Sequence, residues 1–263
     1  MSALARGIFA GLFRGRDRRA QSESSVPAQP SAEELLASIE PDIRVPLLSM
    51  YWGEPQMGFD GQRHAIDSVT AIVPSQGMWL YGLCLSIKPK TSLEIGMAYG
   101  YSTLFFLAAI AKNQAGVHTS IDPFQRSMWH GIGLAHARAH SGGSDSRFRL
   151  IEDRSDRAAT DLSREGATFD LIFIDGAHRF DDVLVDFYLY APLCPIGGHI
   201  VFDDLWMKSI QTAVAFIRSN RKDFAERPTD QPNVCLFQRI GEDSRDWADF
   251  HEFAVAGSEG RVA

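Results

Sequence analysis

Short apolar runs alternate with longer amphipathic stretches over residues 91–240. The runs have the length of buried strands, and the stretches between them have the spacing of helices. We expect strands at 92–95, 117–121, 148–151, 171–174, 199–202 and 234–238. We expect helices at about 102–112, 126–139, 156–163, 179–190 and 208–219. Alternation of this kind predicts an α/β fold, in which helices cover both faces of a doubly wound, mostly parallel sheet.

Helices are also predicted ahead of the sheet. Ser31 and Glu34 form a Ser-x-x-Glu capping box before an apolar run, and Pro41 is expected to end that helix. Residues 42–73 have a mixed, loop-rich pattern, whereas residues 76–87 are apolar on nearly every face. Because a helix that is apolar all round is buried, we expect the second helix to be buried.

These patterns divide the chain into four segments. They are a disordered basic tail and linker at 1–30, a helical or lid segment at 31–90, the α/β domain at 91–240 and a C-terminal tail at 241–263. Residues 3–19 combine apolar positions with arginines. The sequence leaves open whether this stretch is only disordered or rests on an anionic membrane surface or a partner.

Composition and charge exclude several classes of protein. The formal net charge of −7 argues against an electrostatic nucleic-acid partner. The three cysteines are widely separated and odd in number, which predicts buried thiols in a reducing cytoplasm instead of a disulfide framework. The sequence contains no apolar run of the roughly 18 residues that a membrane-spanning helix needs.

A glycine loop follows the first strand of the α/β domain. Gly96 and Gly100 separate that strand from the next helix, where glycine lets the backbone pass close to a ligand. The helix N-terminus beyond them suits a carboxylate or a phosphate. The spacing is not the Gly-x-Gly-x-x-Gly of dinucleotide enzymes. By itself the loop leaves open a turn that binds nothing.

Acidic residues follow three other strands, at the edge where parallel sheets bind ligands. Asp122 ends the second strand and is placed either to accept hydrogen bonds from a ribose or to sit in a solvated turn. Asp175 follows the fourth strand, and Asp203 and Asp204 follow the fifth. Three converging carboxylates raise one another's pKa unless a cation binds. Magnesium, or manganese or calcium in its place, would relieve the repulsion. Helix-capping and loop roles without a metal remain the alternative.

His178 is the candidate general base, because its ordinary pKa suits proton removal near neutrality. Together with Asp175 it makes up the catalytic candidates of the chain. The alternative is a histidine at a helix start, bonded to Asp181 or Asp182. His136 and His140 lie four residues apart on a predicted helix. We interpret them as surface histidines.

Residues 94–102 read Glu-Ile-Gly-x-x-x-Gly-Tyr-Ser. This stretch resembles motif I of class I S-adenosylmethionine-dependent methyltransferases, in the variant of catechol and caffeoyl-coenzyme A O-methyltransferases and their bacterial relatives. The resemblance implies a Rossmann-like sheet of seven strands with an N-terminal helical extension. It also implies S-adenosylmethionine as cofactor.

The same resemblance implies roles for single residues in binding the cofactor. Glu94 would hold the ammonium group of the methionine part, and Gly96 and Gly100 would bring the backbone close to it. Ser102 would cap the helix and contact the carboxylate. Asp122 would bind the ribose. Ser155, after the third strand, would either line the adenine or cap a helix.

Metal-dependent O-methyltransferases carry an aspartate after strand four and an acidic–amide or acidic–acidic pair after strand five. Asp203 and Asp204 resemble the pair of bacterial enzymes that methylate sugars. The resemblance implies that Asp175, Asp203 and Asp204 bind a magnesium ion, which would hold two neighbouring hydroxyls of the acceptor. The acceptor would be a small molecule such as a sugar, a catechol or an acyl conjugate, and a homodimer is one expected assembly.

Residues that could contact the acceptor are chosen only by their position along the chain. Trp52, Gln76 and Trp79 belong to the segment expected to form a lid, and Trp206 and Lys208 follow the aspartate pair. Three other functions stay open from the sequence. They are a nicotinamide-dependent oxidoreductase, a non-catalytic binding module on the same fold, and metal-independent methyl transfer to nitrogen or carbon.

Overall fold

The computed structural model describes residues 30–141 and 147–255. Residues from Ser31 onward belong to one compact unit. Its main sheet has seven strands: β3 (Thr91–Ile95), β4 (Val117–Ile121), β5 (Phe148–Ile151), β6 (Leu171–Ile174), β7 (His199–Phe202), β8 (Phe224–Arg227) and β9 (Cys235–Arg239). The strand order is β5-β4-β3-β6-β7-β9-β8. The first five strands of this order are parallel, and β9 runs antiparallel to both β7 and β8. The predicted fold class is confirmed.

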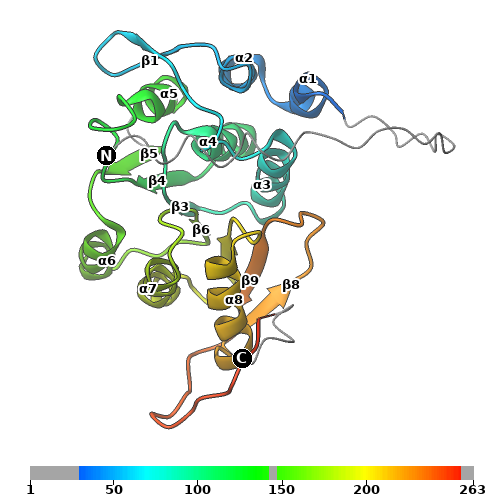
Figure 1. The fold of residues 1–263 in the computed structure, drawn as a ribbon, viewed down its shortest axis with the longest axis vertical. Coiled ribbons are helices and arrows are strands. Elements are labelled where there is room, and N and C mark those ends of the chain that lie inside the picture. Colours follow the sequence, from blue (N-terminus) through cyan, green and yellow to red (C-terminus); the bar gives the residue numbers. More distant parts are fainter. Residues whose placement is uncertain (1–29, 142–146, 256–263) are drawn as a thin grey trace, which may run out of the picture. The chain divides into compact units, whose positions relative to one another are not determined.

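Helices cover both faces of this sheet (Figure 1). On one face lie α3 (Pro74–Ile87), α4 (Tyr101–Asn113) and α5 (Ile132–His140), and on the other lie α6 (Ser155–Arg164), α7 (Phe180–Tyr190) and α8 (Lys208–Asn220). A short 3₁₀ turn, η2 (Ala191–Leu193), follows α7. The two faces bury separate cores, as the alternating side chains of β6 show. Leu171 and Phe173 point to the first core, and Ile172 and Ile174 to the second.

From β3 the chain continues to β4 and β5 on one side of the sheet, and it then returns to β6 and β7 on the other side. The strand order therefore reverses beside β3. In register, Ile95 pairs with both Ile121 and Ile174, and Ile174 pairs with Phe202. The residues that follow β3, β4, β6 and β7 therefore emerge at one edge, at the switch point where open α/β sheets bind ligands.

The N-terminal segment contains a helix that the sequence analysis did not predict. The capping box of Ser31 is confirmed at the start of α1 (Ala32–Leu35), which continues into η1 (Leu36–Ser38). Pro41 does not end that helix but opens the next one, α2 (Pro41–Tyr51). Proline suits the first helical position because the N–H that it lacks has no partner there. Pro46 inside α2 also made the stretch resemble a loop.

Beyond α2 the chain forms a two-stranded hairpin, β1 (Gln56–Met57) and β2 (Arg63–His64). Two further expectations needed adjustment. The helix expected from residue 126 begins only at Ile132, and the edge strand β8 was missed because its sequence, Phe-Ala-Glu-Arg, is not an apolar run.

All three cysteines are free and buried, as predicted. Within the described ranges, every helix is too short or too polar to cross a membrane. The predicted basic tail, including residues 3–19, lies outside the described residues, as do residues 256–263.

Residues of α2 and α3 share one hydrophobic core with those of α4 and β6. The domain boundaries remain predictions.

Candidate active site

The glycine loop is packed against backbone on two sides. Gly96 has a φ of 92°, and a Cβ added to it would overlap the carbonyl oxygen of Asp175. Gly100 has a φ of 87°, and its added Cβ would lie 2.9 Å from the Cα of Gly133. Both positions therefore require glycine for reasons internal to the protein. The close approach also joins the glycine loop to the loop after β6.

Glu94 lies near the end of β3 and is enclosed by the protein. Its side chain is 0% exposed. Its Oε2 accepts a 2.7 Å hydrogen bond from Ser102, and its Oε1 accepts hydrogen bonds from Ser120 (2.6 Å) and Thr103. The Nε2 atom of His118 is 3.3 Å from the same Oε1. The geometry thus argues against the expectation that Glu94 holds the cofactor's ammonium, because donors inside the protein already surround both oxygens.

Ser102 takes part in this buried network and is not a helix cap. The N-cap of α4 is Gly100, without a capping side chain, and the hydroxyl of Ser102 donates to Glu94. The expectation that Ser102 caps the helix is therefore wrong. Its hydroxyl is directed into the protein, so cofactor binding at this helix start would rely on backbone N–H groups.

Glu94 is expected to make folding sensitive to acid. Burial acts to raise its pKa, but the charge and hydrogen bond of His118 and the two serine hydroxyls outweigh burial and hold the pKa below 4.5. A carboxyl with a lowered pKa stabilises the fold above its ordinary pKa, and that stability is lost as the pH falls through the folded-state value. We expect Glu94→Gln to lower the free energy of unfolding at pH 7 by about 2 kcal/mol. We also expect it to flatten the decline below pH 4.5.

Urea unfolding at several pH values measures both effects. Glu165→Gln is the control, because Glu165 is an exposed carboxyl paired with Arg149 on the surface and should change little. An unchanged acid limb in Glu94→Gln would show that Glu94 is not charged in the folded protein.

Asp122 connects two strand-end loops. Its Oδ2 accepts hydrogen bonds from the backbone N–H groups of Met97 (3.2 Å) and Ala98 (2.8 Å) in the glycine loop. Its Oδ1 accepts one from Phe124 (2.7 Å). Asp122 is buried, so the alternative of a solvated turn aspartate is wrong. The role in binding ribose stays a prediction.

Ser155 is the first residue of α6, whose N-cap is Arg154 without a capping side chain. The alternative that Ser155 caps this helix is therefore wrong. Its carbonyl accepts a 2.8 Å hydrogen bond from Tyr190, and its hydroxyl bonds to the buried carboxyl of Asp186. The role near adenine stays a prediction.

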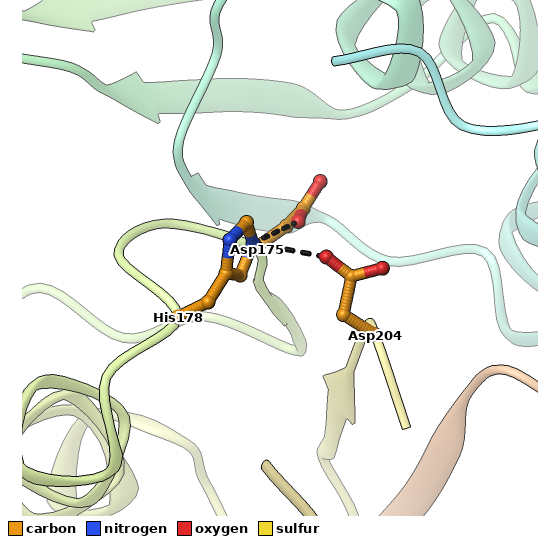
Figure 2. A group of neighbouring side chains, drawn as sticks. All are labelled: Asp175, His178 and Asp204. Atoms are coloured by element: carbon orange, nitrogen blue, oxygen red, sulfur yellow. Dashed lines mark hydrogen bonds and ion pairs between the residues drawn. The ribbon is translucent and has the colours of Figure 1, made fainter. Parts of the chain in front are cut away.

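Figure 2 shows a group of two carboxylates and an imidazole, drawn from the loops after β6 and β7. Ligand atoms of Asp175, His178 and Asp204 all lie within 4.8 Å of one another. The His178 Nε2 atom is 3.0 Å from Asp204 Oδ2 and 3.4 Å from Asp175 Oδ1. These are its partners in place of Asp181 and Asp182, so the alternative of a helix-start histidine is wrong.

Asp203 is placed differently from the other two aspartates. It is 4% exposed, and its Oδ1 accepts hydrogen bonds from Gln76 Nε2 (2.5 Å), the backbone N–H of Asp204 (2.6 Å) and Asn233 Nδ2 (3.1 Å). It lies outside the group of ligand atoms drawn in Figure 2. The structure thus brings two of the three predicted metal ligands together with His178 and leaves the third, Asp203, outside that group.

Burial and neighbouring groups raise the pKa of three side chains in this site. Burial, with the nearby charge of Asp204, raises the pKa of Asp175 to about 6. Burial, with the charge of Asp175, raises the pKa of Asp203 to about 8. The hydrogen bond to Asp175 raises the pKa of His178. Carboxylate oxygens that lie this close together fit a hard divalent cation such as magnesium or manganese.

Trp206, which the sequence analysis placed near the acceptor by position alone, lies beside this group of side chains. The indole of Trp206 is 70% exposed, and its N–H donates a 2.8 Å hydrogen bond to Asp204 Oδ1. Asn233 was missed because it lies in a polar turn with no motif, and His118 because a core histidine leaves no signal in the sequence pattern. The pair His136 and His140 is not at the surface as expected. Both are half-buried, and burial lowers the pKa of His136 to about 4.

Comparison with known proteins agrees with this geometry. Residues 93–205 match the family model described as "Methyltransferase domain". The O-methyltransferase hkm8 of Aspergillus hancockii is 27% identical over 151 residues, which cover 57% of each chain. The catechol O-methyltransferase of Niastella koreensis is 29% identical over 106 residues, covering 40% of this chain and 45% of that one. The chain therefore spans about half the length of these relatives.

Solved structures share the fold. The O-methyltransferase TomG of Streptomyces achromogenes, in complex with S-adenosylmethionine, superposes with a TM-score of 0.58 at 19% identity, over 80% of this chain and 94% of that one. The sheet and its switch point are those of the methyltransferase fold, and residues 93–205 match the methyltransferase domain model. The chain resembles the O-methyltransferases of the catechol and caffeoyl-coenzyme A type, and the resemblance read from motif I is confirmed.

Proposed function

We propose that the protein transfers a methyl group from S-adenosylmethionine to a hydroxyl of a small molecule, with the help of a divalent cation. The observation that carries the proposal is the group of Asp175, His178 and Asp204 beside the glycine loop. The carbonyl of Asp175 contacts Gly96, so the predicted cofactor loop and the acidic group are neighbours. Asp175 and Asp204 would hold the ion, which lowers the pKa of a bound hydroxyl.

The residues of the chain perform the remaining steps. The methyl group of S-adenosylmethionine is already activated, so the protein mainly aligns the acceptor oxygen with the methyl carbon and sulfur. A C–O bond forms as the C–S bond breaks, which leaves S-adenosylhomocysteine. His178 lies against the same two carboxylates, and its imidazole would accept the proton of the hydroxyl once Asp175 and Asp204 hold the ion instead.

A ring-shaped acceptor suits the rim of this site. Trp206 presents an exposed indole beside Asp204, and such a surface stacks on sugar or aromatic rings. A sugar, a catechol or an acyl conjugate with neighbouring hydroxyls would meet both the indole and the ion. One curated relative is named a catechol O-methyltransferase, which supports this class of acceptor. We further propose that the protein acts in the cytoplasm without nucleic acid. A homodimer stays a prediction.

The test is methyl transfer from labelled S-adenosylmethionine to a panel of sugars, catechols and acyl conjugates. We expect product in the presence of Mg²⁺, loss of product with a chelator and recovery when Mg²⁺ is restored. Calorimetry should show binding of S-adenosylmethionine but not of NAD. Product that forms equally well with the chelator would overturn the role of the metal, and NAD binding would favour an oxidoreductase instead.

A further inference from the structure

We propose that Gln76 and Asn233 are positioning residues that hold Asp203 and, through it, aim Asp204 at the metal ion. We call these two side chains and their hydrogen bonds to Asp203 the amide clamp. The inference rests on the proposed function, because it concerns the affinity of that site for its cation. It assigns a role to two residues that lie in different parts of the sequence and that carry no motif.

The amide clamp converges on a single atom. Oδ1 of Asp203 accepts hydrogen bonds from Gln76 (2.5 Å), from Asn233 (3.1 Å) and from the backbone N–H of Asp204 (2.6 Å). These donors come from the first turn of α3, from the turn before β9 and from the loop after β7. Three independent segments thus fix the orientation of one buried carboxylate.

Asn233 is held so that its amino group faces the carboxylates. Its Oδ1 accepts a 3.2 Å hydrogen bond from the backbone N–H of Trp206, and its own carbonyl accepts one from Leu205 (3.0 Å). Its Nδ2 is therefore directed to Asp203 (3.1 Å) and Asp204 (3.4 Å). A flip of the amide would lose these bonds, so Asn233 acts as a donor and not as a metal ligand.

The clamp reaches Asp204 through the backbone. Asp204 has a φ of 57°, in the left-handed region that non-glycine residues seldom adopt. The hydrogen bond from its N–H to the side chain of Asp203 stabilises this turn, and the turn directs the Asp204 carboxylate toward His178. If Asp203 were free to rotate, the Asp204 carboxylate would no longer be held in the orientation that faces His178.

Neutral amides are suited to this task. They stabilise a buried carboxylate by hydrogen bonds without adding a positive charge. A lysine or arginine in the same place would neutralise the site and compete with the cation. Both amides also lie outside residues 93–205, the segment that matches the family model. The helix α3 and the turn before β9 thus complete a site whose ligands belong to the matched segment.

Manganese is the probe for the test, because its dissociation constant can be measured by electron paramagnetic resonance on the full chain. We expect Gln76→Met and Asn233→Leu each to weaken Mn²⁺ binding about 10- to 100-fold, the range seen when groups that orient metal ligands are removed. The Mg²⁺ concentration for half-maximal activity should rise by the same factor. Saturating Mg²⁺ should restore most of kcat, and the affinity for S-adenosylmethionine should stay unchanged.

Gln56→Met is the matched control. Gln56 is another buried glutamine that donates to Ser49 and to the Glu54 carbonyl, away from the acidic group. It should lose stability without losing affinity for Mn²⁺. If the Gln76→Met chain does not fold, Gln76→Asn, which keeps the amide but shortens its reach, carries the same measurement.

Two outcomes overturn the inference in different ways. A wild-type chain that binds Mn²⁺, with clamp variants that bind it equally well, refutes the clamp and leaves the proposed function intact. A wild-type chain that binds no Mn²⁺ refutes both the clamp and the role of the metal. Binding of S-adenosylmethionine, measured separately, still tests the methyltransferase assignment.

Discussion

Exchange of Asp204 for asparagine is expected to lower the rate of methyl transfer about 1,000-fold, which corresponds to about 4 kcal/mol of transition-state stabilisation. The variant keeps the shape of the side chain and an oxygen that can accept the hydrogen bond of Trp206. Asparagine also tolerates the left-handed backbone at this position. The exchange removes the charge and places an amino group where Oδ2 faces His178, so the site loses one of its two carboxylate ligands.

The measurement is kcat at saturating S-adenosylmethionine over a range of Mg²⁺ concentrations. Calorimetry should show unchanged cofactor affinity, because Asp204 lies beyond the glycine loop. Asp161→Asn, which removes an exposed carboxylate on α6 paired with Arg164, should have full activity. Wild-type rates in Asp204→Asn would exclude this carboxylate from the chemistry.

The sequence alone is enough to predict that the candidate ligands lie at one edge of the sheet. The apolar run 171–174 was predicted residue for residue, because buried parallel strands are apolar on both faces and end at polar residues. Once the strands are known, parallel pairing brings Asp122 and Asp175 to the same edge. This part of the site depends only on periodicity and topology.

The orientation of the side chains at that edge does not follow from the same rule. Glu94 immediately precedes the strand end, yet it is turned into the interior by two serines, a threonine and His118. Asp203 and Asp204 are adjacent, yet one is enclosed by amides and the other faces His178. Gln76 lies 127 residues from its partner Asp203. Contacts of this range depend on packing between elements, which no local pattern encodes.

Gly96→Ala should damage the protein more than any other single methyl group added to the glycine loop. We expect it to lower the free energy of unfolding by about 4 kcal/mol, the sum of left-handed strain and overpacking. The new Cβ would overlap the carbonyl oxygen of Asp175, and because that atom belongs to the backbone, no change of rotamer can relieve the overlap. Either the glycine loop or the loop after β6 must move. Cofactor and Mn²⁺ binding should therefore weaken together.

Gly82→Ala separates this steric effect from the ordinary consequence of replacing a glycine. Gly82 lies on the exposed side of α3, and no atom lies within 4 Å of its added Cβ. Alanine there should raise the free energy of unfolding by about 0.5–1 kcal/mol, because it removes freedom from the unfolded chain. Urea denaturation of both variants gives the comparison. A Gly96→Ala chain as stable as wild type would mean that the two loops are not in contact, and the proposed closeness of cofactor and metal would lose its structural basis.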